Sequence, residues 1–232
     1  MRNLLLATAM LALAACSASP SEESAARQSG ADSFPDQPEA VSEGRFAPQN
    51  ECVELPGAKL FFVDLGKAVR ERDADALLKL TSKDVKLDFG GGGGLTTFRE
   101  RLAAEDGQLW KELDKILILG CAKDESGNMV LPWYFAQDLG VDDPFTTMLT
   151  LGSAVVLHES PSAESKALET VAWDTVETLG QYDPAAKYEK VRTRSGKEGF
   201  IATEELRSLI DYRLSAAPTG DSWQIVFFVA GD

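Results

Sequence analysis

The feature that most constrains the fold is a series of short alternating segments between residues 150 and 206. Apolar and polar residues alternate around Val155, around Val191 and again near Ile201, and Pro, Gly and Asp clusters separate the segments. Alternation with a period of two is typical of half-buried strands, and closely spaced turn signals indicate short antiparallel connections. We therefore predict a small all-β barrel over residues 141–206.

Composition excludes several classes of partner and site. The chain has 232 residues, of which 44% are hydrophobic, and this suits one or two globular domains. Its net charge of −14 argues against a nucleic-acid partner, because binding to a duplex depends on Lys and Arg that neutralise phosphates. His158 is the only histidine, so neither a His-rich metal site nor a Ser-His-Asp mechanism is expected. From the sequence we assign no catalytic residue, metal ligand or cofactor.

The first 15 residues predict a signal peptide. Arg2 precedes a short apolar run, too short to span a bilayer, which ends at Leu13-Ala14-Ala15-Cys16. These four residues resemble the lipobox of bacterial lipoproteins. The resemblance implies that Cys16 is lipidated and that the protein is anchored in the cell envelope. With Ser17 after the cysteine, it implies the outer membrane, facing the periplasm, if the cell is Gram-negative. The alternative is an ordinary signal peptide with a chance cysteine.

Residues 16–50 predict a disordered tether. The segment is rich in Ser, Ala, Glu and Pro, and its large apolar residues are only Phe34, Val41 and Phe46. So few apolar side chains do not offset the entropy lost when a chain of this length is ordered. The tether would hold the folded part away from the membrane.

Cys52 and Cys121 follow the tether. Export places them in an oxidising compartment, where a pair of cysteines predicts a disulfide. The alternative is two buried free thiols.

The segment after the tether predicts helices and one strand. Apolar residues recur at helical spacing over residues 58–72, and Asp73 is a candidate cap for a second short helix. Val85, Leu87 and Phe89 alternate with polar residues, which indicates a half-buried strand. Residues 97–100 read as a capping box for a helix that reaches about residue 104.

Two further features leave alternatives open. Five glycines at residues 90–94 lie between the strand and the next helix. A flexible connection is favoured over an anion-binding loop, because no Lys-Ser or Lys-Thr follows the glycines. Trp133 and Tyr134 are candidates either for a pocket wall or for ordinary core positions.

The C-terminal residues predict a hairpin outside the barrel. Tyr212, Leu214 and Ala216 alternate, residues 218–221 form a turn, and residues 223–230 are apolar on both faces. A small barrel has no place for these strands, so we expect them to join the sheet of the first domain. The predicted organisation is a discontinuous α+β domain at residues 51–140 and 207–232, with the barrel inserted at residues 141–206.

Several residues of the predicted barrel resemble the bacterial SH3 (SH3b) family. The first strand carries Val155, Leu157 and Pro161-Ser162, with His158 where the family usually has Arg. Tyr188 and Val191 correspond to a Trp-x-x-Val pattern, and Gly196-x-x-Gly199-Phe200-Ile201 to a turn and strand, followed by a short helical turn at 203–206. The whole chain resembles SH3b-containing envelope lipoproteins. The resemblance implies non-catalytic binding of cell-wall material, such as peptidoglycan, or of an envelope protein or peptide.

One strand of this segment predicts a basic face. Lys190, Arg192 and Arg194 alternate with other residues and so share a side of the strand. Together with Tyr188 they are the candidate ligand-binding residues, because a basic face is able to contact an anionic polymer. The alternative is a solvated outer face that discourages edge pairing.

The order of elements in the first domain resembles the NTF2-like family, a curved antiparallel sheet wrapped on helices. The fold class expected for the chain is therefore α+β, with NTF2-like helices and sheet and an inserted SH3-like barrel. This second resemblance implies an alternative function, that of a pocket enzyme or small-ligand-binding protein. Asp88 is then the candidate base, although the polar phase of its strand favours a solvent-facing position.

Overall fold

The computed structural model describes residues 43–231. The predicted signal peptide, the predicted lipidation site Cys16 and the part of the predicted tether up to residue 42 lie outside the described residues. Helices and strands are both present, so the class is α+β, as predicted. Within residues 43–231, no helix combines the length and the apolar character needed to cross a membrane.

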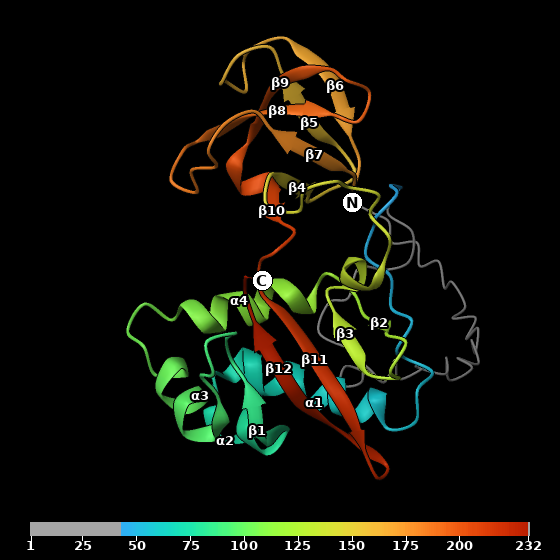
Figure 1. Ribbon diagram of the computed structural model, residues 1–232, viewed down its shortest axis with the longest axis vertical. Helices are drawn as coiled ribbons and strands as arrows, with labels where there is room; N and C mark the ends of the chain where they lie inside the picture. The colour runs from blue at the N-terminus through green and yellow to red at the C-terminus, as the bar shows by residue number, and fades with distance from the viewer. Residues whose placement is uncertain (1–42, 232) are drawn as a thin grey trace, which may run out of the picture. The chain divides into compact units, whose positions relative to one another are not determined.

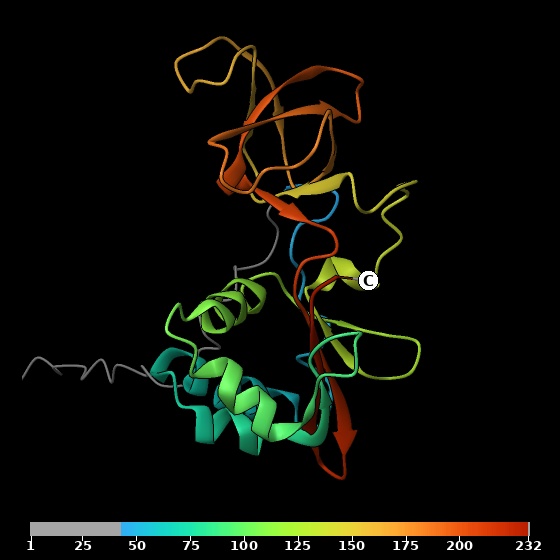
Figure 2. The ribbon, with the colours of Figure 1, turned by 60° about the vertical axis from the view of Figure 1, so that its left-hand side comes forward.

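The first sheet has five strands and is accompanied by four α-helices (Figures 1 and 2). The strand order is β1-β12-β11-β3-β2. The helices are α1 (Ala58–Glu71), α2 (Ala74–Lys79), α3 (Gly94–Leu102) and α4 (Gln108–Leu117). The strands are β1 (Thr81–Lys86), β2 (Ala122–Lys123), β3 (Met129–Leu131), β11 (Arg213–Thr219) and β12 (Ser222–Val229).

The C-terminal hairpin joins this sheet, as the sequence predicted. Strand β11 pairs with β3, and β12 pairs with β1, with Thr81 opposite Ile225. The prediction of a wholly antiparallel sheet is wrong, because β1 and β12 run parallel. Parallel neighbours need a long connection, and the chain between β1 and β12 contains the remaining helices and all the other strands.

The helices cover one face of the five-stranded sheet, and the main core lies between the helices and the sheet (Figure 2). From the helices, Phe62, Leu65 and Leu113 enter this core, where they meet Ile225 and Phe228 of β12. The alternation of β12 changes phase between Ile225 and Phe228, because the register with β11 shifts there. A bulge of this kind places an extra residue in one strand, so both Ile225 and Phe228 face the helices.

The start of α3 differs from the prediction. Asp73 caps α2 through its carboxylate, which accepts a hydrogen bond from the Ala76 amide at 2.9 Å, as expected. By contrast, α3 begins at Gly94, three residues before the predicted capping box at 97–100. The glycine loop folds back on β1, where Gly93 forms a bridge with Lys86. A Cβ at Gly93 would collide with the carbonyl oxygen of Val85, so this close backbone approach requires glycine.

The second sheet has seven strands in the order β10-β4-β7-β8-β9-β5-β6. They are β4 (Thr147–Thr150), β5 (Val155–His158), β6 (Ala167–Val171), β7 (Thr175–Thr178), β8 (Tyr188–Thr193), β9 (Glu198–Ala202) and β10 (Leu206–Ser208). A 3₁₀ turn, η2 (Thr203–Glu205), follows β9 where a helical turn was predicted. Val155, Leu157, Val191 and Ile201 form its core with Met148, Val171, Val176 and Leu206. The sheet is open: within residues 43–231, no pairing joins β10 to β6 to close a barrel.

The end of the predicted tether is ordered. Phe46 is buried, and its amide donates a hydrogen bond to the carbonyl of Trp173 at 2.8 Å. Gln49 accepts one from the Cys121 amide at 2.8 Å. The prediction of disorder is therefore wrong for residues 43–50. The partners of these residues lie far along the chain, so local composition does not reveal them.

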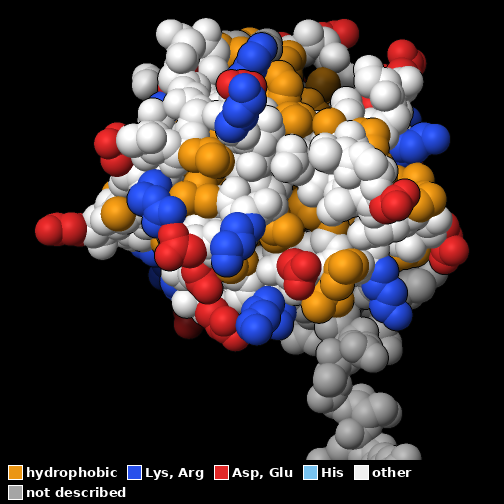
Figure 3. Space-filling model, turned by 90° about the horizontal axis from the view of Figure 1, so that it is seen from below, with side chains coloured by type: hydrophobic (Ala, Val, Ile, Leu, Met, Phe, Trp, Pro, Cys, Tyr) orange, Lys and Arg blue, Asp and Glu red, His pale blue; other side chains and the backbone are white. Residues whose placement is uncertain are grey.

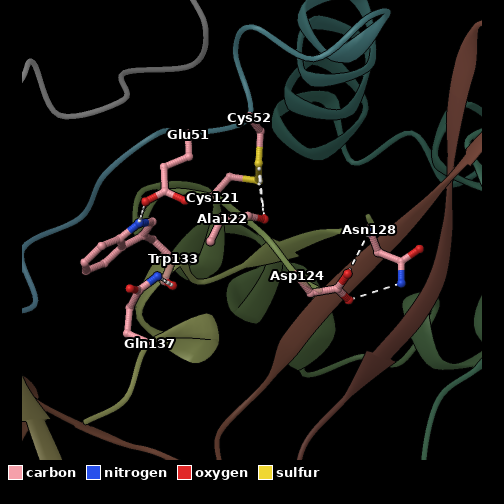
Figure 4. Close-up of a disulfide and its surroundings, with 8 residues drawn as sticks. All are labelled: Glu51, Cys52, Cys121, Ala122, Asp124, Asn128, Trp133 and Gln137. Carbon is pink, nitrogen blue, oxygen red and sulfur yellow. Dashed lines mark hydrogen bonds between the residues drawn. A yellow bond between two sulfur atoms is a disulfide. The ribbon is translucent and has the colours of Figure 1, made fainter. Parts of the chain in front are cut away.

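The disulfide between Cys52 and Cys121 is present, as predicted (Figure 4). Both residues are fully buried, and their Cα atoms are 5.8 Å apart. The bond joins the segment before α1 to the segment after α4. Next to it, Glu51 accepts a hydrogen bond from the Trp133 indole at 2.8 Å. This contact and the burial of Trp133 and Tyr134 place both aromatic residues in the core rather than in a pocket wall.

Candidate functional site

A cleft with a volume of about 820 Å³ lies among the described residues. It is bordered by helix α4, by the loop before β8, and by the residues from the end of β9 to Asp211. Its polar and charged lining residues are Gln108, Glu112, Lys115, Lys187, Thr203, Glu204, Arg207, Ser208 and Asp211, and Tyr182 and Tyr188 are its aromatic ones. A volume of this size is typical of sites for small molecules or short peptides.

Glu112 is a buried carboxylate in this cleft. It lies on α4 between Leu109 and Ile116 on the apolar face of the helix, and only 2% of it is exposed. Its Oε1 accepts hydrogen bonds from the Gln108 amide and the Lys115 ammonium, both at 2.8 Å. Its Oε2 has no hydrogen-bond partner among the residues that the structure describes.

Arg207 lies close to the oxygen of Glu112 that has no hydrogen-bond partner. Its Nη1 lies 3.9 Å from Oε2 of Glu112, beyond hydrogen-bond distance, and 2.9 Å from Asp211. Its Nε donates to the Tyr134 hydroxyl at 3.1 Å and its Nη2 to the Tyr212 carbonyl at 2.7 Å. These contacts hold the buried guanidinium, which is 3% exposed, in a long ion pair with Glu112 that is not a hydrogen bond.

A second unpartnered polar group lies in the same cleft. The Thr203 side chain is 8% exposed, and its hydroxyl has no hydrogen-bond partner in the described part of the chain. Thr203 begins η2, directly after the strand that carries Gly199, Phe200 and Ile201. Buried polar atoms in folded proteins are nearly always hydrogen-bonded. Two exceptions in one cleft therefore point to an external partner, either a ligand or water.

Two tyrosines, Tyr182 and Tyr188, contribute apolar surface to the cleft. Burial raises the pKa of the Tyr182 phenol above its ordinary value, with a further rise from the nearby Glu189 carboxylate, so this phenol is neutral at physiological pH. The ring of Tyr188 packs edge-on against His158, with 6.4 Å between centroids. His158 thus supports Tyr188, and Tyr188 is the one predicted ligand-binding residue that lines the cleft.

The predicted basic face is present but neutralised. On β8, Arg192 contacts Glu177 and Glu198, both at 2.9 Å, and Lys190 lies 3.5 Å from Glu198. Arg194 lies 3.1 Å from Asp174 and also donates to the Leu139 carbonyl at 2.8 Å. The carboxylates come mostly from the neighbouring strands. These cations are therefore engaged in cross-strand ion pairs rather than left for a ligand.

The glycine loop already holds an anion from its own chain. The Asp88 carboxylate accepts a hydrogen bond from the Gly92 amide at 2.7 Å and from Arg101 at 2.5 Å. The Arg101 contact, together with the Gly92 amide, lowers the pKa of Asp88 below its ordinary value. A general base that works near neutral pH needs the opposite shift, so the environment of Asp88 does not suit that role.

Charges of both signs are interspersed on the surface shown in Figure 3. No broad single-sign field, of the kind that would attract a polyanion, is visible on that face. Among residues 43–231, no group of three His, Cys, Asp or Glu side chains is arranged to hold a metal ion.

Sequence reasoning did not single out Glu112, Thr203 or Arg207. A signal for Glu112 is present, because it is a charged residue three positions after Leu109 and four before Ile116 on an apolar helix face. Thr203 and Arg207 have no such local signal.

A search of protein-family models finds none that matches this chain, and a search of curated proteins finds no match either.

Proposed function

We propose that this protein is a non-catalytic, lipid-anchored protein of the bacterial cell envelope that binds its ligand in the cleft. The lipobox resemblance at Cys16 supports the anchor and the localisation. The SH3b resemblance supports a binding module, an SH3-like barrel inserted in an α+β domain. The ligand class that this resemblance implies is cell-wall material or an envelope peptide.

The observation that carries the proposal is the cleft itself. Residues of the SH3b-like segment line it, among them Tyr188, and so does Thr203 directly after the Gly199-Phe200-Ile201 strand. Its lining combines two tyrosine rings with nine polar or charged side chains, so it offers a ligand both apolar contact and hydrogen-bonding groups. The basic face is a weaker candidate, because Lys190, Arg192 and Arg194 are engaged with carboxylates of the same sheet.

The alternative of a pocket enzyme has less support. Its candidate base, Asp88, is ion-paired with Arg101, and the pKa of Asp88 is lowered rather than raised. The core between the sheet and the helices is filled by large apolar side chains such as Phe62, Phe98 and Phe228.

Retention of the full chain, purified in detergent, on isolated peptidoglycan tests the proposal. Ala186 lines the cleft, so Ala186→Trp should fill part of it and reduce retention. Ala185→Trp is the matched control, because the neighbouring Ala185 is exposed and is not among the lining residues. We expect Ala185→Trp to bind like the wild type.

A third variant, with Lys190, Arg192 and Arg194 all changed to Ala, tests the basic face. We expect retention close to that of the wild type. Loss of retention in this variant, with full retention of Ala186→Trp, would move the binding site from the cleft to the strand face and refute the proposal.

A further inference from the structure

We infer that the cleft recognises a short peptide through a free ammonium group, with Oε2 of Glu112 as the acceptor. This inference rests on the proposed function and names the chemistry of the ligand. It assigns a recognition role to Glu112, on helix α4, which lies outside the SH3b-like segment.

The first step concerns what Glu112 lacks. An ionised carboxylate has about four acceptor positions, and a buried one needs partners to offset the loss of water. Gln108 and Lys115 both serve Oε1, which leaves Oε2 without a hydrogen bond. A hydrogen-bond donor from a ligand would give Oε2 of this carboxylate the partner that it lacks.

The second step concerns the charge of the donor. The cleft lining contains three carboxylates, Glu112, Glu204 and Asp211, against the cations Lys115, Lys187 and Arg207. Arg207 already bonds to Tyr134, Tyr212 and Asp211 and lies 3.9 Å from Oε2 of Glu112, beyond hydrogen-bond distance, and Lys115 bonds to Oε1 of Glu112. With Arg207 and Lys115 engaged by protein groups and a net charge of −14 on the whole chain, a cationic donor is favoured over an anionic ligand at Oε2 of Glu112.

The third step concerns the rest of the ligand. The unpartnered hydroxyl of Thr203 is suited to donate a hydrogen bond to a carbonyl, and Tyr182 and Tyr188 offer flat apolar surface. A peptide supplies carbonyls, short apolar side chains and an amine together. A cleft of about 820 Å³ suits a short peptide better than the face of a folded protein.

The experiment compares two probes that differ by one ammonium group. The probes are acetyl-Ala-Lys-Ala-amide and acetyl-Ala-norleucine-Ala-amide, titrated into the full chain in detergent at low salt and followed by calorimetry. Loss of a charge-assisted hydrogen bond weakens binding about 10-fold to 100-fold. We therefore expect the lysine peptide to bind more tightly than the norleucine peptide by that factor.

Variants locate the acceptor. Glu112→Gln keeps the shape and removes the charge, and it should bring the lysine peptide down to the affinity of the norleucine peptide. Asp114→Asn, on the same helix, is the matched control, because Asp114 pairs with Arg72 and does not line the cleft. Thr203→Val should weaken both probes equally. If Glu112→Gln does not fold, the two probes on the wild type and the Thr203→Val variant still test the inference.

The outcomes separate this inference from the proposed function. Equal binding of the two probes, no binding of either, or unchanged discrimination in Glu112→Gln would overturn the ammonium assignment and leave water as the partner of Oε2. The proposed function would still stand if Ala186→Trp loses retention on peptidoglycan. Acetylation of the peptidoglycan amines then identifies the source. Lost retention indicates that the free amines of wall peptides are recognised, whereas unchanged retention refutes recognition of wall peptides through these amines.

Discussion

Removal of the disulfide is the perturbation whose size follows most directly from the structure. Cys52 and Cys121 are separated by 69 positions, and the bond closes a loop that contains all four α-helices. In the chain-entropy model, closing a loop of this length stabilises the folded state by about 4 kcal/mol, through the entropy it removes from the unfolded chain. The variant Cys52→Ala/Cys121→Ala should lose most of this stabilisation.

The folded structure gives no reason for the two ends to separate without the bond. The amide of Glu51 donates to the Cys121 carbonyl, and the amide of Cys121 donates to the Gln49 carbonyl, both at 2.8 Å. These backbone contacts hold the segment before α1 beside the segment after α4. The main cost of removing the disulfide therefore falls on the unfolded state.

Thermal unfolding followed by circular dichroism measures the effect. For a protein of this size, 1 kcal/mol corresponds to about 2–4 °C, so Tm should fall by about 8–16 °C in the double variant. Wild-type protein unfolded with reductant is the control, because it keeps every atom of the side chains and lacks only the bond. A fall of less than about 3 °C in both samples would refute the loop-entropy reasoning.

Three further predictions concern the core, the ion pairs and the anchor. Phe228→Ala, in the core between Tyr212 and Phe98, should lower the free energy of unfolding by about 3–5 kcal/mol in a denaturant titration, and a loss under about 1 kcal/mol would contradict its core role. Asp88 and Glu198 have pKa values lowered by Arg101 and Arg192, so the stability they contribute is complete above their ordinary pKa values of about 4 and is lost as pH falls through the lowered values. Asp88→Asn should therefore flatten the acid limb of a plot of Tm against pH, and an unchanged limb would exclude this pair as a contributor. Cys16→Ser should release the protein from the membrane fraction; unchanged fractionation would remove the anchor from the proposal.

Local patterns predicted most of the elements well. Helix α1 ends within one residue of the predicted end, and the alternating segments around Val155, Val191 and Ile201 are strands. These features depend on residues close together in the chain, so periodicity reveals them. The errors fall where a distant partner decides the conformation. Gly93, for example, meets the backbone of β1, and this contact moves the start of α3 ahead of the predicted capping box.

The sequence by itself determined the α+β class and the strand-rich character of residues 150–206, and it predicted the pairing of Cys52 with Cys121 and a C-terminal hairpin that joins the first sheet. Only the tertiary structure decided which strands are neighbours. It placed β12 parallel to β1 and left the seven-stranded sheet open. It also showed that carboxylates of the neighbouring strands neutralise Lys190 and Arg192 of β8.

The candidate site is among the features that only the tertiary structure decided. Glu112 and Arg207 are 95 positions apart, yet their side chains are both buried and their charged groups lie 3.9 Å apart. No local period relates a glutamate on a helix to an arginine on a distant strand. A cleft is formed by contacts between remote segments, and its unpartnered atoms are recognised only when every possible partner has been placed.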